Sequence, residues 1–109
     1  ISGVQKLYGA GTGNARTYNV RTDSPGVFRP SERCWYLDYN NDGYVDFTTY
    51  YGLNGDLPIV GDWLGNGKDT IGVFRPSERS WYLDYNNDGY VDFTTYYGLN
   101  GDLPVTGKW

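Results

Sequence analysis

The sequence predicts an all-β protein whose units have the size and strand content of β-propeller blades. A long segment occurs twice in nearly identical form. Aromatic residues make up 18% of the chain beside 16 glycines, a composition that favours strands and tight turns over helices. Short runs of β-branched and aromatic residues alternate with Asn, Asp and Gly clusters, which is typical of antiparallel hairpins.

The two copies read GVFRPSERCWYLDYNNDGYVDFTTYYGLNGDLP (26–58) and GVFRPSERSWYLDYNNDGYVDFTTYYGLNGDLP (72–104). They start at residues 26 and 72, so the repeat is 46 residues long. They differ only where Cys34 corresponds to Ser80, which indicates an isolated substitution rather than a functional thiol. Units of this kind stack and share one core.

Within one unit the pattern predicts four short strands. Turns are expected at 77–79, after Pro76, and at 86–89, where NNDG tolerates positive φ. The strands are expected over TIGVFR (70–75), SWYLDY (80–85), YVDFTTYY (90–97) and, at the end of the first copy, LPIVGDW (57–63). Four antiparallel strands in 46 residues is the size of one propeller blade.

The predicted organisation has three parts. Residues 1–25 form a diverged N-terminal segment or partial blade that covers an edge, with candidate strands at 4–8 and 17–22. Residues 26–71 form repeat unit 1, and residues 72–109 form an incomplete repeat unit 2.

Charge and hydropathy exclude two classes of partner. The formal net charge is −4 and no basic cluster is present, so nucleic acid is not expected to bind. No apolar run reaches the roughly 18 residues that a membrane-spanning helix requires, so membrane insertion is not expected.

The motif DYNNDGYVD occurs at 38–46 and 84–92 and has the spacing of a calcium loop. Alternate positions turn oxygens toward one centre, glycine permits the sharp turn, and the tyrosine offers its carbonyl oxygen. The candidate ligands are Asp38, Asn40, Asp42, Tyr44 and Asp46 in the first copy, and Asp84, Asn86, Asp88, Tyr90 and Asp92 in the second. An EF-hand would carry Glu where Thr49 and Thr95 stand, so calcium would bind in a β-hairpin loop. The alternative is a plain hairpin turn whose acids face solvent.

A second acidic stretch, GDWLGNGKDT (61–70), has the same outline but fits a cation less well. Asp62 and Asn66 occupy ligand positions, whereas Leu64 and Thr70 replace oxygen ligands. We interpret it as a degraded metal loop that now serves as a turn.

Together, GDW-x-GNGKDTIGVFRP, WYLDYNNDG and YYGLNGDLP resemble FG-GAP/VCBS-type β-propeller repeats, over roughly residues 26–109. The resemblance implies four-stranded blades around an axis, calcium in acidic loops, an extracellular or cell-surface location, and a role in adhesion or surface architecture. The family's usual calcium site is the loop before the VFRP strand, here the stretch with Leu64 and Thr70.

A closed propeller needs about four blades or more, and this chain supplies about two. Exposed sheet edges invite pairing with another copy, so we expect a homo-oligomer in which blades from several chains close a ring. The alternative is an open stack of two sheets capped by residues 1–25.

We expect a non-catalytic scaffold, because the chain has no histidine and its serines lack a base partner. A lectin-like role is the first alternative, with sugars stacking on exposed aromatic rings. The candidate stacking residues are Trp35, Tyr51, Trp81 and Tyr97. Arg29 and Arg75 are expected to bond or stack between blades. The near-perfect repeat also admits a designed or truncated protein for symmetric self-assembly, although the asymmetric residues 1–25 argue against full design.

Overall fold

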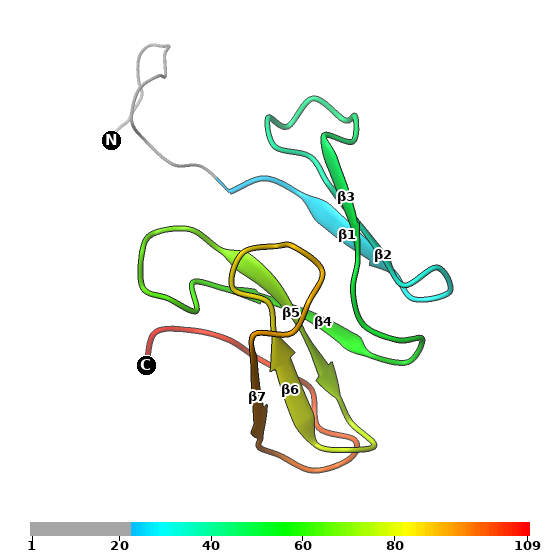
Figure 1. Ribbon diagram of the computed structural model, residues 1–109, viewed down its shortest axis with the longest axis vertical. Coiled ribbons are helices and arrows are strands. Elements are labelled where there is room, and N and C mark those ends of the chain that lie inside the picture. The colour runs from blue at the N-terminus through cyan, green and yellow to red at the C-terminus, as the bar shows by residue number, and fades with distance from the viewer. Residues whose placement is uncertain (1–22) are drawn as a thin grey trace.

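A computed structural model describes residues 23–109 (Figure 1). Over these residues the chain forms two antiparallel sheets and no helix, which confirms the predicted all-β class. No helix capable of crossing a membrane is found there. The strands are β1 (Gly26–Arg29), β2 (Cys34–Leu37), β3 (Phe47–Tyr50), β4 (Leu57–Gly61), β5 (Thr70–Arg75), β6 (Ser80–Leu83) and β7 (Phe93–Tyr96).

The boundary between the two sheets differs from the predicted boundary between the two repeat units. Sheet 1 has the order β1-β2-β3 and sheet 2 the order β4-β5-β6-β7. β4, expected as the fourth strand of the first unit, pairs instead with β5 of the second copy, with Leu57 opposite Phe74 and Gly61 opposite Thr70. A short connection from β3 carries the chain from one sheet into the next, so β4 fastens the two together (Figure 1).

The predicted strands are present, and most are shorter than expected. The strand at 70–75 has the predicted bounds, whereas those expected at 80–85 and 90–97 shrink to Ser80–Leu83 and Phe93–Tyr96. Most of the missing residues lie in the acidic loop, where the N–H groups of Tyr85 and Tyr90 donate to aspartate side chains rather than to a neighbouring strand. The candidate strands at 4–8 and 17–22 lie outside the described residues.

The turns between the first two strands of each repeat form as the sequence indicates. Pro76 ends β5, and the N–H of Arg79 donates to the Pro76 carbonyl at 3.1 Å. Arg79 takes a left-handed φ of 57°, and Arg33 takes 55° at the same place in the first copy. The carbonyls of Arg33 and Arg79 accept the N–H groups of the tyrosines that directly follow β3 and β7, each at 3.0 Å. That bond ties the turn to the adjacent hairpin.

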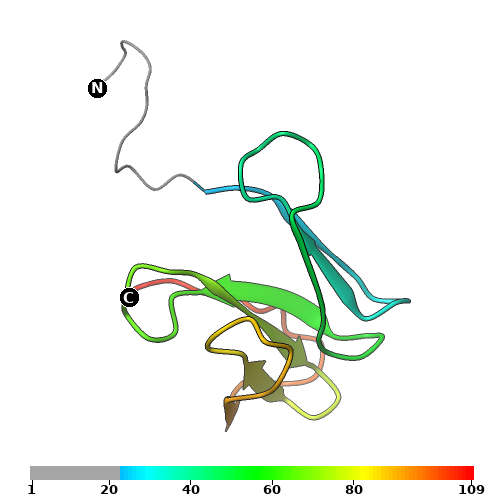
Figure 2. The same ribbon diagram turned by 45° about the horizontal axis from the view of Figure 1, so that its top comes forward.

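The core lies where sheet 1 meets β5 of sheet 2 (Figure 2). Trp35 and Tyr51 from the first repeat pack with Ile71 and Val73 of β5, and each of the four is at most 5% exposed. Burying two large aromatic rings against branched aliphatic side chains is the main favourable term that holds the sheets together.

The Cys34/Ser80 position is buried in both copies. Cys34 is 2% exposed and Ser80 is 0% exposed, and Ser80 Oγ donates to the Glu78 carbonyl at 3.2 Å. Both side chains are small enough for the site, which is consistent with an isolated substitution.

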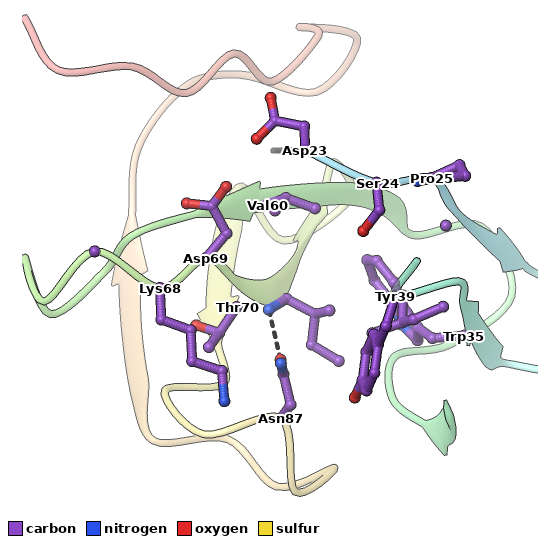
Figure 3. A pocket seen from close by; sticks show the side chains of 14 residues that line it. Asp23, Ser24, Pro25, Trp35, Tyr39, Val60, Lys68, Asp69, Thr70 and Asn87 are labelled. Atoms are coloured by element: carbon purple, nitrogen blue, oxygen red, sulfur yellow. Dashed lines mark hydrogen bonds between the residues drawn. The ribbon is translucent and has the colours of Figure 1, made fainter. Parts of the chain in front are cut away.

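A cleft of about 670 Å³ opens between the sheets beside the core (Figure 3). Trp35 and Tyr39 stand on one side, and Lys68 and Thr70 stand on the other. At its floor, the N–H of Ile71 donates to Asn87 Oδ1 at 2.9 Å, so the second acidic loop is joined to β5.

Candidate metal centres in the acidic loops

The two acidic loops span 38–46, between β2 and β3, and 84–92, between β6 and β7. In each, the last aspartate closes the loop onto the strand it leaves. The N–H of Asp46 donates to the Leu37 carbonyl at 2.9 Å, and that of Asp92 to the Leu83 carbonyl at 2.8 Å. Both loops are therefore fixed at their two ends by the sheet.

The first aspartate organises each loop from within. Asp84 Oδ1 accepts the N–H groups of Asn86 and Asp88, each at 3.2 Å, and Oδ2 accepts that of Gly89 at 2.8 Å. Asp38 makes the corresponding bonds to Asn40, Asp42 and Gly43. Positive φ at Asn87 and Gly89, 57° and 87°, allows these N–H groups to converge on one carboxylate.

Three carboxylates in each loop gather around one point. One oxygen from each of Asp38, Asp42 and Asp46 lies within 4.8 Å of the other two, and the same holds for Asp84, Asp88 and Asp92. These are six of the predicted ligands.

The asparagine at the third position adds a seventh and eighth candidate. One terminal atom of the Asn40 side-chain amide lies 3.1 Å from Asp38 Oδ1 and 3.0 Å from Asp42 Oδ1. The Asn86 amide faces Asp84 and Asp88 in the same way. With the amide nitrogen inward, the side chain donates to both carboxylates. With the amide oxygen inward, it completes an all-oxygen set of the kind that a hard cation prefers.

The predicted tyrosine positions hold their loops through the backbone. The N–H of Tyr44 donates to Asp42 Oδ1 at 2.9 Å, and that of Tyr90 to Asp88 Oδ1 at 3.0 Å. Their rings are 76% and 74% exposed, so the side chains take no part in the cluster.

Identical loop sequences lie in different surroundings. Asp84 is fully buried, whereas Asp38 is half-buried. The second loop packs on β3 of sheet 1, since a Cβ on Gly89 would meet Thr49 Oγ1 and the Tyr50 carbonyl, both at 3.0 Å. A Cβ on Gly43 of the first loop would meet nothing within 4 Å among the described residues.

The difference in burial moves the two pKa values in opposite directions. For Asp84, desolvation outweighs the backbone N–H bonds, and the nearby Asp88 charge adds to it, so the pKa lies above its ordinary value. For Asp38 the desolvation is smaller than the effect of the same N–H bonds, so the pKa lies below it.

Tyr51 lies near the buried loop. Burial raises the pKa of its hydroxyl, and the negative charges of Asp84 and Asp92 raise it further. The hydroxyl is buried and has no hydrogen-bond partner among the described residues.

The stretch at 61–70 forms the same turn without the acidic cluster. Asp62 accepts the N–H groups of Asn66 at 3.0 Å and Gly67 at 2.8 Å, and Asn66 Oδ1 accepts that of Lys68 at 3.0 Å. These bonds hold the pKa of Asp62 below its ordinary value, with Gly67 contributing most. The prediction of a turn here is confirmed.

The residues predicted to stack on sugars fall into two classes. Trp35 and Tyr51 are 3% and 5% exposed, so they have no face open to a sugar, and stacking in the first copy is excluded by their burial between the sheets. Tyr97, in contrast, is 77% exposed, and Trp81 is partly exposed.

The sequence predicted that Arg75 bonds or stacks between blades, but it did not identify Asp56 as the partner in this ion pair. Arg75 Nε and Nη2 donate to the two oxygens of Asp56 at 2.8 and 2.9 Å, and the guanidinium lies 4.6 Å from the Tyr82 ring centre. Asp56 is only 4% exposed, so this is a bidentate, largely desolvated pair. The repeated GDLP and VFRP motifs contain both residues, yet their separation in sequence gives no sign that they meet.

A scan against protein-family models, a search of curated proteins and a search of solved structures each return no match for this chain. The resemblance to FG-GAP/VCBS-type repeats therefore stays a prediction from the residues quoted above.

Proposed function

We propose that this chain is a non-catalytic, extracellular or surface scaffold of propeller-type repeats whose two acidic loops bind calcium. The observation that carries the proposal is the convergence of three carboxylates, with an asparagine amide beside them, in two loops of the same sequence. Hard divalent cations are bound in proteins by such oxygen sets.

The loop at 61–70 gives a comparison within the chain. It keeps the turn hydrogen bonds although Asn66 stands where the cluster has Asp42 or Asp88. The turn therefore does not require a negative charge at this fifth position. In the acidic loops, the negative charge of Asp42 or Asp88 would serve to bind a cation. The cation would in turn offset the repulsion among the three neighbouring carboxylates.

The architecture is consistent with a scaffold rather than an enzyme. The sheets present strands, tight turns and a shared aromatic core, and the only cysteine is buried. The acids of the loops accept backbone N–H groups, which suits cation binding and rigidity better than proton transfer.

Thermal unfolding with calcium and then with EDTA tests the proposal. Calcium at about one hundred times its dissociation constant stabilises a folded site by about 2.7 kcal/mol. For a domain of this size we expect the Tm to rise by roughly 10 °C for one occupied site. An unchanged Tm in calcium would overturn the proposed metal role.

The control is the double variant Asp42→Asn/Asp88→Asn. An asparagine oxygen still accepts the Tyr44 or Tyr90 N–H, so the turn is retained while one charge is lost from each cluster. We expect this variant to lose most of the calcium-dependent shift and to keep its Tm in EDTA. Asp69→Asn, at an exposed acid outside both clusters, should keep the full shift.

A further inference from the structure

Residues 103–109 repeat the segment that joins the two sheets. LPVTGKW at 103–109 corresponds to LPIVGDW at 57–63, which contains β4. β4 leaves sheet 1 and pairs with β5 of sheet 2. Residues 103–107 leave sheet 2 in the same way after β7, but they pair with no strand within 23–109.

This segment shares two local contacts with its counterpart. The Trp109 ring covers Gly107 as the Trp63 ring covers Gly61, since a Cβ on either glycine would lie under 3.0 Å from the ring. Asp102 Oδ2 accepts the Leu99 N–H at 2.8 Å, as Asp56 does with Leu53. Thr106 Oγ1 donates to the Val60 carbonyl at 2.8 Å and holds the segment beside β4.

The segment is apolar and open to solvent. Leu103 is 80% exposed, Val105 70% and Trp109 93%. The corresponding Ile59 in β4 is only 5% exposed. The segment therefore presents apolar side chains that a partner could cover.

The complementary half lies at the other end of the described chain. β1 corresponds to β5, yet β5 pairs on both sides while β1 pairs only with β2 among residues 23–109. Val27 of β1 is 54% exposed, and its counterpart Val73 is 1% exposed. The Arg29 side chain is 52% exposed, and that of Arg75 is 19% exposed.

The residues before β1 do not repeat the joining strand. Positions 10–15 stand at the repeat offset from 56–61, but they read AGTGNA instead of DLPIVG. Ala10 thus stands where Asp56 and Asp102 occur. Residues 102–107 therefore resemble the joining segment 56–61 more closely than residues 10–15 do, and they are the better candidate to pair with β1.

The surface around Tyr97, next to residues 103–109, is also exposed. Tyr97 is 77% exposed, whereas its counterpart Tyr51 is 5% exposed and packs with Ile71 and Val73. A cleft of about 600 Å³ adjoins this surface, lined among others by Phe74, Trp81, Tyr97, Leu103 and Trp109. Trp81 and Tyr97 line this cleft, and their counterparts Trp35 and Tyr51 lie in the buried core between the sheets.

We propose that residues 103–107 of one copy add to the β1 edge of a second copy, the edge that pairs with no strand among residues 23–109, and so reproduce the β4–β5 junction between chains. The internal junction sets the register, with Leu103 opposite Phe28, Pro104 opposite Val27 and Val105 opposite Gly26. Asp102 then forms with Arg29 the bidentate pair that Asp56 forms with Arg75. Val27 covers Tyr97 as Val73 covers Tyr51.

Addition of a strand to a sheet edge is favourable because it satisfies a row of unpaired backbone groups. Each copy carries both halves, so the contact is head-to-tail and closes rings or propagates. The inference deepens the proposed scaffold role, but it does not depend on calcium.

A charge exchange at the predicted pair tests it. Molar mass is measured by light scattering across a concentration series, for the unchanged chain, Arg29→Asp, Asp102→Arg, and an equimolar mixture of the two variants. The unchanged chain should form species of at least twice the 12.3 kDa chain mass. Each variant alone places like charges opposite each other and should associate at least about tenfold more weakly.

The mixture should restore association, because the arginine introduced at position 102 of one variant meets the aspartate introduced at position 29 of the other. Arg33→Asp is the matched control, since Arg33 is an exposed arginine in the turn after β1 and should associate as the unchanged chain does. A monomeric unchanged chain, or an assembly that neither variant weakens, would overturn the inference. A monomer whose tryptophan fluorescence responds to sugars, and no longer does so after Trp81→Ala, would favour the lectin alternative instead.

Cysteine cross-linking gives a second measurement that does not depend on charge. Pro58 has no N–H, so its pair with Val73 is a non-hydrogen-bonded pair, where opposed Cα atoms are about 4.5 Å apart, within disulfide range. Val27→Cys and Pro104→Cys, both with Cys34→Ser, should oxidise to linked chains when mixed. Val27→Cys with Val105→Cys, one residue out of register, should not.

The two proposals fail separately. Association that is restored by mixing, together with a Tm that ignores calcium, would retain the interface and reject the metal role. A calcium-dependent Tm in a chain that stays monomeric would do the reverse.

Discussion

At the residue scale, Asp38 and Asp84 hold identical loops and experience different surroundings. Each accepts three backbone N–H groups from the residues that follow it. Asp84 is also fully buried, and it lies beside Asp88 and Asp92 in its cluster. Its charge is therefore unfavourable in the folded, metal-free loop, whereas that of Asp38 is favourable.

In EDTA, we expect Asp38→Asn to destabilise the fold more than Asp84→Asn near neutral pH. Both variants lose a bond to a glycine N–H, but only the Asp84 variant also removes a charge that burial opposes. Urea unfolding of both variants measures the difference. A larger loss for Asp84→Asn in EDTA would contradict the assigned pKa directions.

The pH dependence should also separate the two residues. The pKa of Asp84 is raised in the folded state, so its contribution is most favourable below the ordinary value of 3.8 and is lost as pH rises through the folded pKa. The pKa of Asp38 is lowered, so its contribution is present above 3.8 and is lost as pH falls through the folded pKa. Unfolding curves across acid pH, with each Asn variant, should show these opposite slopes.

At the scale of elements, the same loop serves two purposes. A Cβ on Gly43 of the first loop would have no neighbour within 4 Å among the described residues, whereas Gly89 of the second loop packs against β3. The bond from Ile71 to Asn87 ties the second loop to β5 as well. The second acidic loop is thus part of the contact between the sheets.

Gly43→Ala and Gly89→Ala form a matched pair that measures this contact. Both glycines have positive φ, 85° and 87°, so each alanine costs about 1–2 kcal/mol of backbone strain. Gly89→Ala also drives a methyl group against the Tyr50 carbonyl and should cost about 1–3 kcal/mol more. Equal losses in urea unfolding would show that the second loop does not pack on sheet 1.

At the scale of the whole molecule, β4 and β5 form one complete junction between the sheets. The repeat counterparts of these two strands, residues 103–107 and β1, do not pair with each other within residues 23–109. Val73 lies in the complete junction and is 1% exposed, whereas Val27 lies on the β1 edge that is unpaired among residues 23–109 and is 54% exposed. The stability of a single chain is therefore expected to depend on the valine side chain at position 73 and little on the one at position 27.

Val73→Ala should destabilise the monomer by about 2 kcal/mol, through lost burial and the cavity that remains. Val27→Ala should change it by less than about 0.5 kcal/mol. Urea unfolding at concentrations below the onset of association compares them. Similar losses for both would contradict the described core.

Much of the local structure could be predicted from the sequence. The strand at 70–75, the turns at Pro76 and NNDG, and the clustering of Asp38, Asp42 and Asp46 follow from β propensity, turn chemistry and alternate spacing over a few residues. The pair of Asp56 with Arg75 could not be predicted, because it depends on the path from one sheet to the next.

The sequence by itself determined what is identical in the two copies: the strand pairs β2/β6 and β3/β7, the turns, and the hydrogen bonds within each acidic loop. Only the tertiary structure decided where the copies differ: that Tyr51 is buried and Tyr97 exposed, and that β4 belongs to the second sheet. The physical reason is range. Bonds within a turn involve neighbours in the chain, whereas burial depends on what the rest of the molecule places against each surface.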